Sequence, residues 1–152
     1  MAFTSPQWPK NERELSIVFH EDTFCLVFSM LIAPGSRLVG FGPTLDVAAQ
    51  PGNAKCERYY TPADDALTQA WEGVCWCNPP YGRDLGLWIA KAYESAQAGA
   101  TVVCLLPVRT DTRWWQTYIL SAEVRFVPGR LTFGGASNPA PFPSAVVIFR
   151  PR

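Results

Sequence analysis

The 152-residue chain lacks several features that would identify common kinds of site. It has a single histidine, His20, with no partner in the surrounding sequence, so histidine-based catalysis is poorly supported. Its 13 basic and 13 acidic side chains cancel, so no global field attracts nucleic acid, and any such contact must come from a local cluster. It also contains no internal repeat and no low-complexity segment. These absences favour one ordinary compact domain.

The sequence also gives no indication of a disulfide framework or of a membrane-spanning segment. The five cysteines are odd in number, and Cys75 and Cys77 alternate within an apolar run, so we expect free thiols that fill a core in a reducing cytosol. The apolar run at residues 24–33 is about half the length that crosses a bilayer, and it is not placed as a signal peptide. With 48% apolar and 17% charged residues, the composition is typical of a soluble cytoplasmic domain.

Apolar runs alternate with a helical pattern, which predicts an α/β fold with a compact single sheet and flanking helices. A helix is expected over residues 85–98, with Gly99 at its C-terminal end. The unit from Cys75 to Leu106 has the size of a crossover that joins two parallel strands. Thr110 or Asp111 is expected to cap a further helix that runs through Leu120. Strands are expected at residues 45–48, 73–77, 101–106, 124–127 and 145–149.

The tetrapeptide Asn78-Pro79-Pro80-Tyr81 directly follows the apolar run at residues 73–77 and suits the methylation of an amide-like nitrogen. Such an amine donates its lone pair into a π-system, so it becomes nucleophilic only when hydrogen-bond acceptors draw that pair out. Asn78 and the carbonyl of Pro79 can each accept an N–H, and the prolines fix the backbone without adding a donor. Tyr81 offers a face on which a planar base can stack. A proline turn that closes a strand is the alternative interpretation.

This tetrapeptide after a buried strand resembles the catalytic loop of amino-group methyltransferases that use S-adenosylmethionine. The surrounding sequence, from Leu45 to Pro151, is similar to the small phage-type DNA adenine methyltransferases in particular. The segments that carry the similarity include Leu45-Asp46-Val47-Ala48-Ala49, Asp64-Asp65-Ala66-Leu67, Gly99-Ala100-Thr101-Val102-Val103, Arg109-Thr110-Asp111-Thr112-Arg113-Trp114 and Gly129-Arg130-Leu131-Thr132-Phe133-Gly134.

The resemblance implies a Rossmann-like methyltransferase fold, with a catalytic domain at residues 44–152 and a divergent, atypical N-terminal segment at residues 1–43. It implies transfer of a methyl group from S-adenosylmethionine to the N6 amine of a flipped adenine. Double-stranded DNA is then the partner, and neither a metal nor a membrane is involved. The expected setting is the cytoplasm of a bacterial host, with the protein encoded by a phage or prophage.

Individual residues take roles from the same resemblance. The catalytic loop comprises Asn78, Pro79, Pro80 and Tyr81. The cofactor-binding residues are Asp46, Ala48, Asp65 and Ala66, together with Asn78, and those that contact DNA are Tyr81, Arg109, Arg113, Arg130 and Phe133. Asp46 as a strand-end cap and the arginines as scattered solvated charges are the alternatives, and Trp114 and Trp115 are expected in the helix core.

Two other functions stay open beside DNA adenine methylation. The same tetrapeptide chemistry serves adenine in RNA and glutamine in proteins, so the substrate class can differ while the reaction stays the same. The divergent N-terminal segment also leaves open a catalytically degenerate prophage protein that binds DNA or a partner protein through the same surface. Failure to bind S-adenosylmethionine would favour that second alternative.

Overall fold

The computed structural model describes residues 42–133 and 136–152. The expectations for His20, for the apolar run at residues 24–33 and for nearly all of the segment at residues 1–43 lie outside the described residues. The remainder forms one five-stranded sheet in the order β1-β2-β3-β5-β4. The strands are β1 (Leu45–Asp46), β2 (Val74–Cys77), β3 (Thr101–Pro107), β4 (Glu123–Phe126) and β5 (Ser144–Phe149).

The sheet is mixed, with a parallel half and an antiparallel half. Strands β1, β2 and β3 are parallel, as expected for the crossover between Cys75 and Leu106. Strand β5 is antiparallel to both β3 and β4, so β4 runs in the same direction as β3. The α/β class and the single sheet with helices packed on it are therefore confirmed.

Helix α2 (Leu85–Gln97) occupies almost the whole range that the apolar spacing predicts. It ends where expected, because Gly99 adopts a φ of +111°, which is accessible to glycine and costly for other residues. The predicted helix through Leu120 is divided into α3 (Arg113–Tyr118) and a 3-10 turn, η2 (Ile119–Ser121). The cap predicted at Thr110 or Asp111 is wrong, because the Thr112 hydroxyl accepts the Trp115 N–H and starts the helix there.

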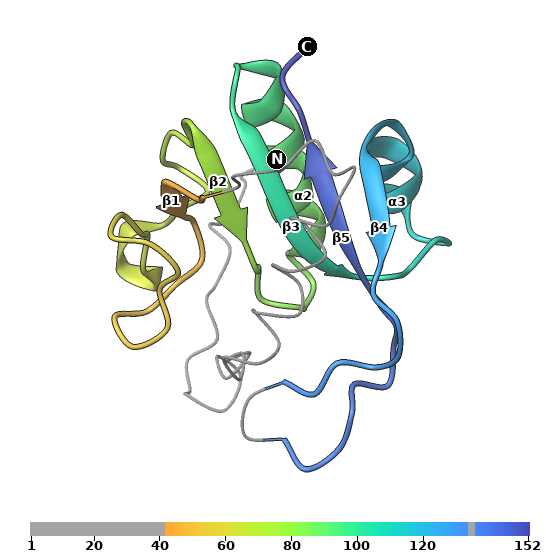
Figure 1. Cartoon of the computed structure of the whole chain (residues 1–152). Coiled ribbons are helices and arrows are strands. Elements are labelled where there is room, and N and C mark those ends of the chain that lie inside the picture. Colours follow the sequence, from red (N-terminus) through yellow and green to blue (C-terminus); the bar gives the residue numbers. More distant parts are fainter. Residues whose placement is uncertain (1–41, 134–135) are drawn as a thin grey trace.

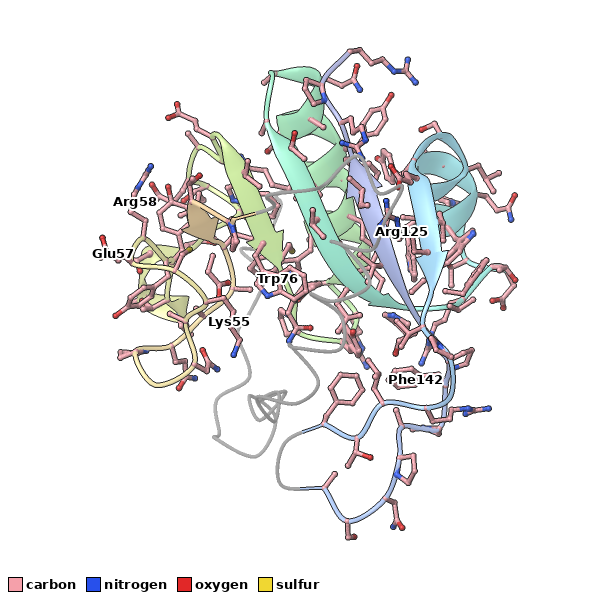
Figure 2. The ribbon with its side chains drawn as sticks, in the orientation of Figure 1. Lys55, Glu57, Arg58, Trp76, Arg125 and Phe142 are labelled. Atoms are coloured by element: carbon pink, nitrogen blue, oxygen red, sulfur yellow. The ribbon has the colours of Figure 1, made fainter. Side chains whose placement is uncertain are left out.

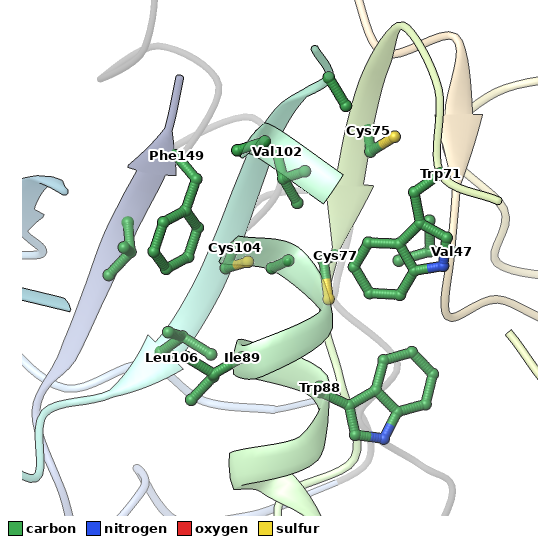
Figure 3. Packing of buried hydrophobic residues seen from close by; sticks show 14 of the residues in the cluster. Val47, Trp71, Cys75, Cys77, Trp88, Ile89, Val102, Cys104, Leu106 and Phe149 are labelled. Atoms are coloured by element: carbon green, nitrogen blue, oxygen red, sulfur yellow. The ribbon is translucent and has the colours of Figure 1, made fainter. Parts of the chain in front are cut away.

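One face of the sheet packs against α2 and α3 (Figure 1). Alternate strand residues, including Cys75, Cys77 and Cys104, point into this layer, where they meet Trp88 and Ile89 of α2 (Figure 3). Trp115 is buried in the same cluster and Trp114 is half-buried against it, so both tryptophans belong to the helix core as expected. Burial of this kind stabilises the fold by about 1.5–3 kcal/mol for each large apolar side chain.

The opposite face carries a second cluster around Trp76 and Leu105, which Val127 and Leu131 of the segment after β4 help to cover. Since β1, β2, β3 and β4 all run in one direction, their carboxyl ends meet at one edge of the sheet. The segments that follow these strands, which begin at residues 47, 78, 108 and 127, all leave from this edge, which lies at the lower side of Figure 1. In open α/β sheets this edge is where ligands bind.

Candidate active site

Asn78 is the first residue after β2 and emerges at the carboxyl edge of the sheet, because Cys77 is the last β2 residue paired with β3. The residue is half-buried, and its Oδ1 atom is shielded from solvent. Pro79 is buried, whereas Pro80 and Tyr81 are half-buried. The prolines bring no N–H group and fix φ, so the carbonyls of this loop are held with little freedom left to lose. A shielded amide oxygen beside a rigid loop is a suitable acceptor for a substrate amine.

Tyr81 is held at both its hydroxyl and its ring. The hydroxyl donates to the carbonyl oxygen of Leu105 in the middle of β3 at 3.1 Å. The ring meets Phe133 and Phe142 edge-on, with ring centroids 5.8 and 5.6 Å away, and these two phenylalanines lie 6.1 Å from each other. Burial raises the pKa of Tyr81, so its hydroxyl stays protonated and remains a donor. We call Tyr81, Phe133 and Phe142 the aromatic cluster.

The aromatic cluster joins two loops that are far apart in sequence. Phe133 and Phe142 both belong to the segment between β4 and β5, and Figure 2 shows Phe142 beneath the carboxyl edge of the sheet. The sequence predicted a role for Phe133 but none for Phe142. Phe142 stands between Pro141 and Pro143, and these prolines restrict the backbone at this position. They do not indicate which other ring the Phe142 side chain contacts.

Asp46 ends β1 and is almost fully buried, with 2% of its surface exposed. Its carboxylate accepts the backbone N–H of Ala48 at 3.2 Å and that of Lys55 at 3.0 Å. Burial raises the pKa of Asp46, and the two N–H bonds and the Lys55 charge partly offset this effect. The main chain of Asp46 also bonds to Arg58 and Tyr60, so this residue organises the whole loop after β1. A carboxylate oxygen has further lone-pair directions, so a ligand can still bind there.

The neighbouring acids Asp64 and Asp65 have different environments. Asp64 ends the 3-10 turn η1 (Pro62–Asp64), and its Oδ2 accepts both the N–H and the hydroxyl of Thr61 at 2.7 Å, which lowers its pKa. Within the described part of the chain, the carboxylate of Asp65 makes no such bond. Its backbone lies in the left-handed region at a φ of +48°, which is uncommon for a residue with a side chain. Backbone strain of this kind clusters at functional sites.

Ala48 and Ala66 differ in what surrounds them. Ala48 is the second residue of the loop after β1 and donates its N–H to the Asp46 carboxylate. Ala66 is completely buried in the core cluster that also holds Trp71 and Trp88, and its carbonyl accepts the Trp71 indole N–H at 2.8 Å. The side chain of Ala66 therefore packs in the core.

The basic residues of the last third separate into two groups. Arg109, Arg113 and Arg130 are exposed and follow β3 or β4 at the carboxyl edge, where Arg83, two residues after Tyr81, is exposed as well. Arg125 and Arg150 instead bind Glu123 at the other end of the sheet. Burial acts to raise the pKa of Glu123, but its bonds to Arg150 and Arg125 outweigh burial and lower it. Several exposed arginines thus lie at the same edge of the sheet as Asn78, and the sequence did not single out Arg83.

Within residues 42–133 and 136–152, no group of three or more histidine, cysteine or acidic side chains is arranged to hold a metal ion. No helix in the same residues is long and apolar enough to pass through a bilayer.

Comparison with known proteins agrees with this arrangement. The model of the family described as DNA N-6-adenine-methyltransferase (Dam) matches residues 36–151. A DNA N-6-adenine-methyltransferase of Haemophilus phage HP1 is 31% identical over 116 residues, which cover 71% of this chain and 67% of the phage protein. A protein of the same name from Escherichia phage T1 is 31% identical over 91 residues, which cover 58% of this chain and 38% of the phage protein. With more than half of its length matched by the family model, the chain belongs to the DNA N-6-adenine-methyltransferase family.

Proposed function

We propose that the protein transfers a methyl group from S-adenosylmethionine to the N6 amine of a flipped adenine in double-stranded DNA. The observation that carries the proposal is the position of Asn78-Pro79-Pro80-Tyr81 at the carboxyl end of β2, with a shielded amide oxygen and an anchored tyrosine. Membership of the adenine methyltransferase family supports the same reaction. We place the reaction in the cytoplasm of a bacterial host, where phage and host DNA are found.

The residues on the β1 side of Asn78 suit the cofactor. Asp46 and Asp65 are carboxylates, and carboxylates bind the amine and hydroxyl groups that S-adenosylmethionine carries. Asp65 fits this role because its carboxylate has no hydrogen-bond partner among the described residues. When bound, the cofactor would supply a methyl group carried on a sulfonium, whose sulfur would retain the electron pair of the broken bond as a neutral thioether.

The catalytic loop activates the adenine amine. Asn78 Oδ1 and the Pro79 carbonyl each accept one N–H, which directs the nitrogen lone pair away from the ring and toward the methyl group. After the N–C bond forms, the nitrogen releases one proton to water, so no side chain has to act as a base. Catalysis then depends on positioning and on hydrogen bonds that are set before the reaction.

DNA contacts come from the same edge of the sheet. Tyr81 and Phe133 provide aromatic surface for the extruded base, and Arg109, Arg113 and Arg130 are exposed where phosphates would pass. Because each phosphate contact releases counterions, DNA binding should weaken steeply with salt. Replacing Arg113 with alanine should reduce that dependence, whereas replacing Arg150, which is bound to Glu123, should not.

The proposal is tested by transfer of labelled methyl groups to duplex DNA by Asn78→Ala. We expect turnover to fall by about 100-fold or more while cofactor affinity measured by calorimetry changes little, since one preorganised hydrogen-bonding group is lost. Asn138→Ala, at an exposed position, is the matched control. An unchanged rate in Asn78→Ala would remove Asn78 from the mechanism.

The same assay separates the other functions. RNA and protein are offered beside duplex DNA, and label in either one alone would change the substrate class. Calorimetric titration of S-adenosylmethionine, with Asp65→Ala in parallel, tests the cofactor site. No binding by a folded chain would identify a degenerate member of the family.

A further inference from the structure

Ser144, the first residue of β5, has a buried side chain that the fold itself does not use. The residue is 1% exposed, and its Oγ has no hydrogen-bond partner among the described residues. Its backbone, by contrast, is well fixed, because its carbonyl accepts the Val127 N–H at 2.9 Å. A buried hydroxyl without a partner destabilises a folded chain, and native structures contain few of them. The hydroxyl at Ser144 therefore points to a ligand that supplies the missing bond.

Ser144 lies at the same edge of the sheet as Asn78. It pairs with Pro107, the last residue of β3, and it comes two residues after Phe142 of the aromatic cluster. Side chains alternate along a strand, so Ser144 shares a face with Val146, which belongs to the cluster around Trp76. The hydroxyl is thus buried at the carboxyl edge, beside the rings proposed to receive the base.

The strand order favours the base over the cofactor as the ligand of Ser144. Only β3 lies between β2 and β5, which places β2 and β5 about 10 Å apart. Strand β1 lies on the other side of β2 and is therefore one strand farther from β5. Asp46 and Asp65, the proposed cofactor residues, lie on the β1 side. A flat base that binds Asn78 through its amine and Ser144 through a neighbouring ring nitrogen, with hydrogen bonds of about 3 Å each, spans most of the separation between β2 and β5.

We propose that Ser144 Oγ donates a hydrogen bond to a ring nitrogen of the target adenine, N1 or N7, and so positions the amine against Asn78. The proposal rests on the proposed function, because it names a further contact in the same site. N1 is bonded to the carbon that bears the amine and N7 to the adjacent ring carbon, so both lie beside the amine, and both are acceptors when the base leaves the helix. Ser144 then serves as a specificity-determining residue that touches the substrate.

The test combines Ser144→Ala with altered bases. The methylated site is first located in DNA treated with the wild-type protein. Duplexes are then made with adenine, 1-deazaadenine or 7-deazaadenine at that site, and kcat/KM is measured for each. On adenine, Ser144→Ala should lose roughly tenfold in kcat/KM, the size expected for one hydrogen bond. Wild-type protein should lose a similar factor on the analogue that lacks the contacted nitrogen, and Ser144→Ala should lose nothing further on it.

Stability distinguishes a ligand contact from a structural one. Because Ser144 Oγ has no partner among the described residues, we expect the Tm of Ser144→Ala to equal or exceed that of the wild type. Ser121→Ala, at the opposite edge, is the control and should leave kcat/KM unchanged. A lower Tm for Ser144→Ala would overturn the contact. So would an equal loss of kcat/KM on 1-deazaadenine and 7-deazaadenine in both the wild-type protein and Ser144→Ala. Absence of methylation by the wild-type protein would instead overturn the proposed function and this contact with it.

Discussion

The hydroxyl of Tyr81 can be tested separately from its ring. Tyr81→Phe removes only the 3.1 Å bond to the Leu105 carbonyl. A hydrogen bond of this kind contributes about 0.5–1.5 kcal/mol net, and a buried carbonyl left unpaired raises the cost toward about 3 kcal/mol. Leu105 is fully buried, so water cannot easily replace the lost donor. We therefore expect Tyr81→Phe to lower the free energy of unfolding by about 1–3 kcal/mol.

Tyr81→Ala removes the ring as well. The two edge-on contacts with Phe133 and Phe142 contribute about 0.5–1.5 kcal/mol each beyond the area that they bury. The truncated side chain also leaves space behind it, and large-to-small aromatic changes cost about 3–5 kcal/mol when the site is well packed. Tyr81 is half-buried, so the lower end of that range applies and the alanine variant should still fold.

Urea unfolding and methyl transfer to DNA are measured on both variants. Tyr81→Phe keeps the ring, so its KM for DNA should stay within a few-fold of the wild-type value, whereas Tyr81→Ala should lose both DNA affinity and turnover. Tyr93→Phe is the matched control, because the Tyr93 ring packs against Tyr118 and Phe149 while its hydroxyl has no bond in the described part of the chain. If Tyr81→Phe unfolds at the same urea concentration as Tyr93→Phe, the anchoring bond does not exist in solution.

Three further predictions follow from the described contacts. Asp46→Asn should lower the free energy of unfolding by about 1–3 kcal/mol, because the single oxygen of an amide can accept only one of the two N–H groups that the carboxylate accepts. Burial raises the pKa of Asp46 above its ordinary value of 3.8, so the protonated acid contributes its full stabilisation to the folded chain below pH 3.8. This stabilisation declines as the pH rises through the raised pKa. Urea unfolding at several pH values should therefore show that the difference in free energy of unfolding between the wild type and Asp46→Asn becomes smaller as the pH rises. Gly73→Ala should lower the free energy of unfolding by at least about 1–2 kcal/mol, because Gly73 has a φ of +72° and a new Cβ would lie 2.7 Å from the Thr44 hydroxyl. Thermal melts should show this loss, and they should show almost no change for Gly52→Ala, where a new Cβ meets nothing within 4 Å. Burial raises the pKa of Cys75 to about 12, so mass spectrometry after brief treatment with a thiol reagent should find Cys56 labelled and Cys75 unlabelled until the chain unfolds.

Features that depend on neighbouring residues in the sequence were predictable. The run at residues 101–106 and the helical spacing after Leu85 predicted β3 and α2 to within a residue or two, because burial on the sheet and on one helix face dictates those patterns. The sequence also placed the tetrapeptide at Asn78 directly after a buried strand, because the tetrapeptide and the apolar run before it are neighbours in the sequence.

Features that depend on distant pairing were not predictable from the sequence. The ring of Tyr81 meets Phe142 sixty-one positions later in the chain, and the antiparallel direction of β5 brings the two together. Glu123 likewise pairs with Arg150 across β4 and β5, which removes that arginine from the set available to DNA. The partnerless hydroxyl of Ser144 is a property of packing alone, and a serine at the start of an apolar run gives no sign of it.

The strand order supports Asn78 as the point at which we propose that methyl transfer takes place. Strand β2 lies between β1, whose loop is organised by Asp46, and β3, which connects the site to β5 and the aromatic cluster. A cofactor on the β1 side and a base on the β5 side, as proposed, would therefore meet beyond the end of β2, where the two prolines fix the backbone next to Asn78. Changes on the β1 side should then alter cofactor affinity first, changes at Phe142 or Ser144 should alter base selection first, and changes at Asn78 should alter turnover with little effect on either affinity.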